Sequence, residues 1–146
     1  MSLSSDNSRL FVANPALGVV GEVDLNTLQV VRSTSFVPTG DIGLAKFGGG
    51  TPGPATGGMV LSMDGSMLYL ADTTGVLAMT TSDLKVKARL LPGTAVVSLG
   101  LADNGKVLYA VRRNGSAVRV DPTDGAVIQE LDGSGYVAVL RVVTPG

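Results

Sequence analysis

The chain has 146 residues, with 11 basic and 12 acidic side chains, a formal net charge of −1, and no His, Cys or Trp. The absence of His and Cys excludes from this chain zinc sites built from those residues, thiol nucleophiles, redox cysteine pairs, Ser-His-Asp triads and disulfide frameworks. The near-neutral charge provides no field that attracts nucleic acid or an anionic membrane, and no apolar run reaches the roughly 20 residues of a membrane span.

Composition indicates one ordered, turn-rich domain over residues 1–146. Hydrophobic residues make up 45% of the chain and charged residues 16%, which argues against disorder, while 20 Gly and 7 Pro predict many turns. Residues 1–6 carry no basic segment followed by an apolar stretch, so no signal peptide is expected here. The compartment is not determined, because large domains without Cys occur in both cytosolic and secreted proteins.

Short apolar runs rich in Val, Leu, Tyr and Phe alternate with turns, which is typical of strands, and no run requires a helix. A first group of strands is predicted at 9–14, 19–24 and 29–35, and a second at 58–62, 67–72, 76–80 and 85–91. A third group is predicted at 95–102, 107–111, 117–121 and 127–131, followed by a last strand at 136–143.

An internal repeat groups these strands. Asp6, Asp64 and Asp103 occur in matching segments, at spacings of 58 and 39 residues, which gives a period near 40 with an insertion after the first copy. A period of about 40 to 45 residues is the size of one four-stranded propeller blade. A second turn recurs in each unit, at residues 23–28, 79–84 and 120–125.

The predicted fold class is therefore all-β, with about three four-stranded antiparallel β-propeller blades. The units are approximately 3–35, 58–91 and 95–131, with an insertion loop at 36–57 and a closing inner strand at 136–143. With strands named A to D from the propeller axis outward, the chain is expected to open without a strand A and to end with a surplus one. Three blades cannot close a ring, so the chain is expected to be a partial propeller or half of a homodimeric ring.

The repeat units resemble those of a known family. The segment Leu-Ser-Met-Asp-Gly-Ser-Met-Leu-Tyr-Leu-Ala-Asp at 61–72 and the segment Leu-Phe-Val-Ala-Asn at 10–14 are similar to the "SPDGxxLYVAN" units of YVTN and NHL-like bacterial β-propellers. The sequence departs from that pattern where Ser5, Met63 and Ala102 replace the Pro before each Asp. The resemblance implies a C-terminal portion of a propeller, from a family that includes lactonases, redox-enzyme subunits and surface-layer proteins.

Strand direction places the B–C and D–A loops of all blades at one end, hereafter the B–C/D–A face, where binding is expected. In the insertion, Ile42, Leu44 and Phe47 with Lys46 at their rim suggest a lid or partner contact; the alternative is a tether between blades. Adjacent Arg112 and Arg113 could hold a carboxylate or phosphate, or simply form a solvated Asn-Gly turn. The candidate ligand- or partner-binding residues on this face are Lys46, Phe47, Asp72, Arg112 and Arg113.

No catalytic, cofactor or metal residues are predicted. The repeated Asp6, Asp64 and Asp103 suggest calcium, but they belong to three different blades, so turn capping is the favoured interpretation. Tyr69 and Tyr109, at matching positions, are expected in the core between blades rather than as catalytic acids.

Function is predicted at the level of class. The leading hypothesis is a non-catalytic β-propeller scaffold or binding module for a protein or small-molecule ligand, with no cofactor. The alternative is part of a propeller enzyme, a lactonase-like hydrolase or a redox-enzyme subunit, whose active site lies in blades outside this chain. A third hypothesis is a purely structural surface-layer repeat.

Overall fold

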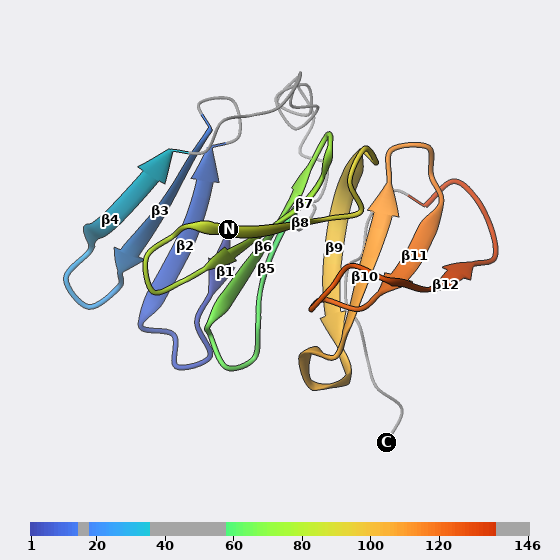
Figure 1. Ribbon diagram of the computed structural model, residues 1–146. Helices are drawn as coiled ribbons and strands as arrows, with labels where there is room; N and C mark the ends of the chain where they lie inside the picture. Colours follow the sequence, from blue (N-terminus) through green and yellow to red (C-terminus); the bar gives the residue numbers. More distant parts are fainter. Residues whose placement is uncertain (15–17, 36–57, 137–146) are drawn as a thin grey trace.

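The computed structural model describes residues 1–14, 18–35 and 58–136, except for the side chain of Asp103. These residues form three four-stranded antiparallel sheets that stand side by side like the blades of a propeller (Figure 1). The predicted all-β class, with three four-stranded blades, is confirmed.

Each blade is formed by four consecutive strands, A to D. Blade 1 contains β1 (Ser2–Leu3), β2 (Arg9–Asn14), β3 (Val19–Asp24) and β4 (Gln29–Ser35). Blade 2 contains β5 (Met59–Leu61), β6 (Met67–Asp72), β7 (Gly75–Thr80) and β8 (Val86–Leu90). Blade 3 contains β9 (Val96–Ala102), β10 (Val107–Arg112), β11 (Ala117–Val120) and β12 (Val127–Leu131), with a short 3₁₀ turn at Asp103–Gly105.

One topological prediction was wrong. The chain does not open without a strand A, because β1 pairs with β2 through Ser2↔Phe11 and Leu3↔Leu10. Two residues are too few for an alternating pattern to be recognised in the sequence, and only the pairing with β2 makes them a strand. Of the predicted last strand, Tyr136 lies outside any strand, and residues 137–143 lie outside the described residues, as does the insertion 36–57.

The three blades share one register. A bulge interrupts the pairing of strands C and D at the same place in each blade, next to Val23↔Val30, Met79↔Val86 and Val120↔Val127. The turn between those strands carries a residue with positive φ at its fifth position, which is Leu28, Leu84 or Gly125. This agreement between blades allows residues to be matched by position from blade to blade.

The apolar core lies between neighbouring sheets. In β6 the side chains alternate, so that Leu68 and Leu70 pack with Phe11 and Val20 of blade 1. On the other side of the same strand, Tyr69 and Ala71 join a cluster with Leu108 and other residues of blade 3. The period of two along a strand thus explains why both faces of blade 2 are apolar.

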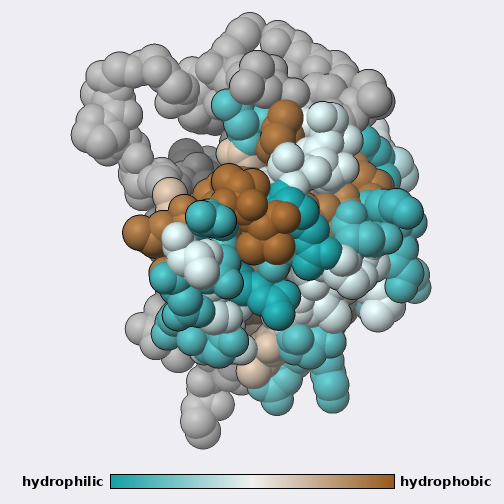
Figure 2. Space-filling view, turned by 90° about the vertical axis from the view of Figure 1, so that its left-hand side faces the viewer, coloured by the Kyte–Doolittle hydropathy of each residue, from teal (hydrophilic) through white to brown (hydrophobic). Residues whose placement is uncertain are grey.

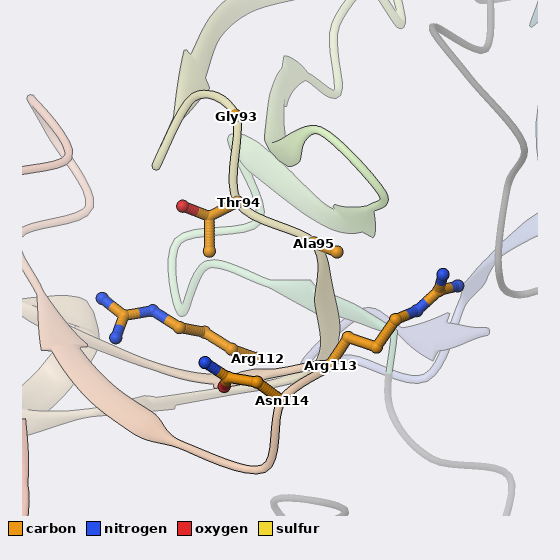
Figure 3. A pocket seen from close by; sticks show the side chains of 6 residues that line it. All are labelled: Gly93, Thr94, Ala95, Arg112, Arg113 and Asn114. Atoms are coloured by element: carbon orange, nitrogen blue, oxygen red, sulfur yellow. The ribbon is translucent and has the colours of Figure 1, made fainter.

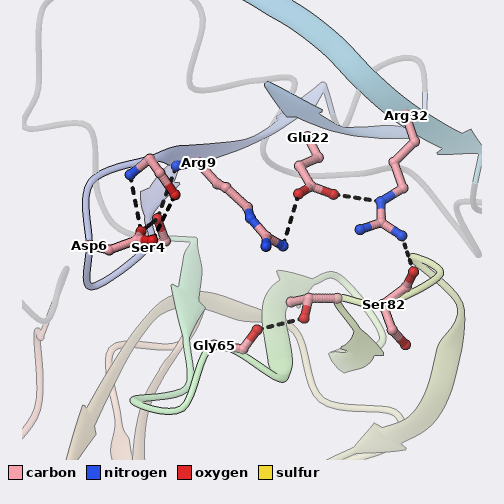
Figure 4. A network of polar contacts seen from close by, with 9 residues as sticks. Ser4, Asp6, Arg9, Glu22, Arg32, Gly65 and Ser82 are labelled. Atoms are coloured by element: carbon pink, nitrogen blue, oxygen red, sulfur yellow. Dashed lines mark hydrogen bonds and ion pairs between the residues drawn. The ribbon is translucent and has the colours of Figure 1, made fainter. Parts of the chain in front are cut away.

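A charged group also contributes to the boundary between blades 1 and 2 (Figure 4). Glu22 is only 2% exposed, and its carboxylate accepts hydrogen bonds from Arg9 Nη1 at 3.3 Å and Arg32 Nε at 2.5 Å. Arg32 also donates from Nη1 to the carbonyl oxygen of Ser82, in the β7–β8 turn. The network therefore neutralises a buried carboxylate and connects the outer strand of blade 1 to blade 2.

Candidate functional site

The connections at the upper end of Figure 1 include the B–C turns of blades 2 and 3 and the connection from β8 to β9. Two of these segments line an open pocket of about 520 Å³. One is the β8–β9 connection, which contributes Gly93, Thr94 and Ala95, and the other is the β10–β11 turn, which contributes Arg112, Arg113 and Asn114 (Figure 3). Segments about 20 residues apart in sequence thus form one site.

Backbone bonds fix the two pocket segments. The amide of Arg113 donates to the carbonyl of Ala95 at 2.9 Å, which joins the turn to the connection. The turn is closed by the Gly115 amide, which donates to the Arg112 carbonyl at 3.0 Å, and Gly115 has φ +83. Asn114 Oδ1 accepts from the amide of Ser116 at 3.0 Å, as Asn does in an Asx turn. The Asn-Gly pair therefore forms the tight turn that its sequence predicts.

Arg112 is held by a carboxylate and retains one unused donor. Its Nη1 and Nη2 donate to Glu130 at 2.8 and 2.9 Å, a bidentate pair. Its Nε is buried and has no hydrogen-bond partner among the residues that the structure describes. A buried N–H without an acceptor is unfavourable, so the ion pair with Glu130 holds Arg112 in place at the cost of one unpaired donor.

Arg113 is exposed, and its guanidinium forms no ion pair within the described part of the chain. Figure 3 shows the side chains of Arg112 and Arg113 extending in opposite directions, with Asn114 between them. The two arginines therefore do not form a single clamp. Arg113 contributes an uncompensated positive charge beside the pocket, and Arg112, already paired with Glu130, contributes to its lining.

Asp72 lies away from this pocket, in the B–C turn of blade 2. It is 3% exposed and accepts hydrogen bonds from Arg89 Nη1 at 2.5 Å, Thr74 Oγ1 at 2.8 Å and the amide of Thr73 at 2.7 Å. Burial opposes its ionisation, but the bonds from Arg89, Thr74 and Thr73 outweigh burial and hold the pKa of Asp72 below its usual range. Its oxygens are therefore already bonded within the blade.

Of the five residues predicted for binding, the structure brings Arg112 and Arg113 together in one pocket. Lys46 and Phe47 lie outside the described residues, so their predicted role stays a prediction. Sequence reasoning did not single out Thr94, Ala95 or Asn114 as pocket residues. The available signal was strand direction, which places the connection before strand A and the turn after strand B at the same end of a blade.

Asp6 and Asp64, two of the three recurrent aspartates, cap turns at the opposite end of the blades. In blade 1, Asp6 accepts from Ser4 Oγ at 2.6 Å, from Ser8 Oγ at 2.8 Å and from the Ser8 amide at 3.0 Å (Figure 4). These hydrogen bonds, the one from Ser4 first, lower the pKa of Asp6 to about 2. Among the described residues no group of three or more acidic, His or Cys side chains is placed to hold a metal ion.

Asp64 repeats this arrangement in blade 2. Ser62 Oγ donates to it at 2.6 Å, and Ser66 donates from Oγ at 2.7 Å and from its amide at 3.1 Å. The bonds from Ser62 and then Ser66 lower the pKa of Asp64 to about 2. The capping interpretation therefore describes both turns, because each carboxylate satisfies the donors of its own loop.

The two matched tyrosines have different surroundings. Tyr69 is 6% exposed in the core between blades 2 and 3, where burial, followed by the charges of Asp64 and Asp121, raises the pKa of its hydroxyl. Tyr109 lies on the face of blade 3 that points away from blade 2, and the guanidinium carbon of Arg119 lies 5.9 Å from its ring centroid. Tyr69 is thus a core residue, as predicted, but the same prediction was wrong for Tyr109, which is only partly buried because no described blade packs on that face of blade 3.

Comparison with known proteins supports the fold. No family model matches the sequence. No curated protein matches it either. Among solved structures, the chain is similar to the Kuenenia stuttgartiensis hydrazine synthase, with a TM-score of 0.72 and 16% sequence identity over 93% of this chain. The matched region spans 36% of that enzyme's chain, and at this identity the likeness shows the fold alone. In the described residues, no helix has the length and apolarity needed to cross a bilayer.

Proposed function

We propose that this chain is a non-catalytic β-propeller scaffold that binds a ligand with an anionic group at its B–C/D–A face. The observation that carries the proposal is the open pocket between residues 93–95 and 112–114, which is lined by Thr94, Asn114 and two arginines, one of them without an ion pair among the described residues. The resemblance of the repeats to YVTN and NHL-like propellers agrees with such a role, because rigid blades commonly present binding loops.

The chemistry of the pocket favours a carboxylate or a phosphate. Asn114 uses Oδ1 to accept from Ser116, which leaves its amide group as a donor. Thr94, which carries a hydroxyl donor, also lines the pocket, and exposed Arg113 adds positive charge to its rim. Donors without matching acceptors attract an oxygen anion, and hydrogen bonds to charged groups contribute about 1.5–3 kcal/mol each.

The test is a titration with acetate and with inorganic phosphate. Binding is monitored by NMR, through the chemical shifts of the backbone amides of the chain. We expect shifts at Thr94, Ala95, Arg113 and Asn114. The informative variant is Asn114→Asp, which keeps the oxygen that closes the turn but places a negative charge in the pocket. It should weaken binding about tenfold or more, the loss of one charge-assisted hydrogen bond.

The matched control is Asn26→Asp, the same isosteric change at an exposed turn on the opposite face. It should leave anion binding unchanged. Equal binding by the wild type and Asn114→Asp, or no shifts at the four amides with either anion, would contradict the proposed function.

A second candidate is that this chain is part of a propeller enzyme. The solved structure it resembles is an enzyme, hydrazine synthase, of whose chain the match covers 36%. This chain contains no His or Cys, so the reacting groups of a hydrolase or redox enzyme would be Asp, Glu, Arg, Lys or Tyr side chains or would lie in other blades. The test is turnover of a lactone or a redox substrate by a protein that carries these blades together with others. Turnover that the Asn114→Asp variant leaves unchanged would favour this candidate.

A further inference from the structure

An apolar row crosses all four strands of blade 1 on the face that points away from blade 2. Cross-strand pairing aligns Leu3 with Leu10, Leu10 with Val23, and Val23 with Val30. We call this surface the open face. Leu3 is 51% exposed and Val30 66% exposed, and Leu10 and Val23 are partly exposed. Figure 2 views the molecule from the side of blade 1 and shows apolar residues gathered there, with polar ones around them.

The same row occurs in the other two blades, where its two central residues are covered and the strand D residues, Val86 and Val127, stay 47% and 46% exposed. In blade 2 it is Leu61, Leu68, Met79 and Val86, and in blade 3 it is Leu101, Leu108, Val120 and Val127. The two central residues of each row are 0% exposed, because the preceding blade packs on them. Only the row of blade 1 has no described blade in front of it. The central residues of the blade 1 row, Leu10 and Val23, therefore match residues that are buried by a neighbouring blade in both blade 2 and blade 3.

What covers the row is also repeated. Phe11 of blade 1 packs in the cluster that covers Leu68, and Tyr69 of blade 2 packs in the cluster that covers Leu108. The register places Phe11, Tyr69 and Tyr109 at one position, opposite Glu22, Ala78 and Arg119 respectively. Tyr109 is the third aromatic residue of this series, and it is partly exposed. Within the described residues, blade 3 therefore has a covering face on which no blade packs, and blade 1 has a row that no blade covers.

Side-chain size and hydrogen bonding fit these two faces together. On the open face, Gly21 stands where blades 2 and 3 have Leu77 and Val118, so this position carries a smaller residue than its counterparts. Blade 3 supplies a large group, Arg119, whose Nε is buried without a hydrogen-bond partner among the described residues. Between blades 1 and 2, Arg32 bonds to the carbonyl of Ser82, and Asn26 occupies the place of Ser82 in the corresponding turn of blade 1.

We propose that two copies of this chain associate head to tail, each placing its Tyr109–Arg119 face on the open face of the other. The two contacts are identical and close a ring of six blades, within the range of four to eight that propellers use. Gln129, which holds the place of Arg32 in blade 3, bonds to the turn of the other copy at Asn26, as Arg32 does to Ser82 within the chain. This inference is independent of the anion pocket and concerns a different surface.

The test is the mass in solution, measured by light scattering after size exclusion, with folding checked by circular dichroism and thermal unfolding. The wild type should have twice the mass of the 14.8 kDa chain. The open-face variant Leu3→Glu with Val30→Glu should be a folded monomer, since both side chains are more than half exposed. The matched control is Met63→Glu, which changes a side chain that is 65% exposed in a turn of blade 2 and should remain a dimer.

A mixing experiment identifies the head-to-tail arrangement. Arg119→Glu alters the other face and should also be monomeric by itself. Mixing it with the open-face variant restores one unaltered contact and should produce heterodimers. In the alternative dimer, two open faces meet. Such a dimer would persist in the Arg119→Glu variant, and mixing the two variants would not produce heterodimers. Either observation overturns the proposal. A folded monomeric wild type also overturns it, and would assign the open face to a blade of another polypeptide.

Discussion

Asp72 accepts a hydrogen bond from Arg89 Nη1 at 2.5 Å, and the matching positions of blade 3 hold the same ion pair with its charges exchanged. There Arg112 is the residue at the end of strand B and Glu130 is the residue on strand D. The register supports the match, because Arg89 pairs with Leu77 and Glu130 with Val118. Each bridge connects strand B to strand D across strand C, so it stabilises a blade whichever residue carries the charge.

Exchange of the charges in blade 2 should therefore be tolerated. Arg89→Glu places two carboxylates together, one of them buried, and should lower the free energy of unfolding by about 3–5 kcal/mol. The double variant Asp72→Arg with Arg89→Glu reproduces the blade 3 arrangement and should recover at least half of that loss. Urea denaturation measures both. A double variant as unstable as the single one would show that the surroundings of blade 2 accept only one polarity.

The charged group at the boundary of blades 1 and 2 has an apolar counterpart. Arg9, Glu22 and Arg32 occupy the positions that Met67, Ala78 and Ala88 occupy between blades 2 and 3. Arg32→Ala leaves buried Glu22 with only Arg9 and also removes the bond to Ser82, so it should cost about 2 kcal/mol. The triple variant Arg9→Met, Glu22→Ala and Arg32→Ala should be more stable than Arg32→Ala alone, because no buried charge remains. Chemical denaturation compares the two, and the opposite order would contradict this account.

Gly75 is required by its surroundings as well as by its backbone angle. It has φ +143, and a Cβ there would lie 2.5 Å from the carbonyl oxygen of Leu90. Gly75→Ala should therefore destabilise the protein by more than the roughly 1–2 kcal/mol that positive φ alone costs an L residue. Gly65→Ala is the control, since Gly65 has φ +72 and nothing within 4 Å of an added Cβ. Thermal unfolding of the two variants should rank Gly75→Ala as clearly less stable.

The capped aspartates predict how stability depends on pH. Hydrogen bonds lower the folded-state pKa of Asp6 and Asp64 to about 2, from an ordinary value of 3.8. A lowered folded pKa contributes stability above the unfolded pKa, and that contribution is lost as pH falls toward the folded value. The melting temperature should therefore fall between about pH 4 and pH 2.

The variant Asp64→Asn separates this effect from general acid denaturation. It removes one titrating group, so its melting temperature should depend less steeply on pH in this range than that of the wild type. Asp132→Asn changes an exposed carboxylate that accepts no hydrogen bond within the described part of the chain, and serves as the control. Identical pH profiles for Asp64→Asn and the wild type would contradict the assigned role of the turn.

The blades themselves were predictable because their signals are local. Alternation along Met67–Asp72 defines a strand with two buried faces, and the recurring Asp and Asn-Gly segments define turns through their own side chains and backbone angles. These effects act within a few residues, so they repeat wherever the sequence repeats. For the same reason, strand direction correctly placed Arg112 and Arg113 among the loops of one face.

Tertiary structure alone determined how distant residues pair. Ser2 and Leu3 become a strand only because β2 offers them an edge, and Arg112 lies in an ion pair only because the register of β10, β11 and β12 brings Glu130 to it. Likewise, the open face is defined by the packing of blade 2 on the opposite side of blade 1. Such pairings depend on register and on the packing of whole sheets, which no short stretch of sequence specifies by itself.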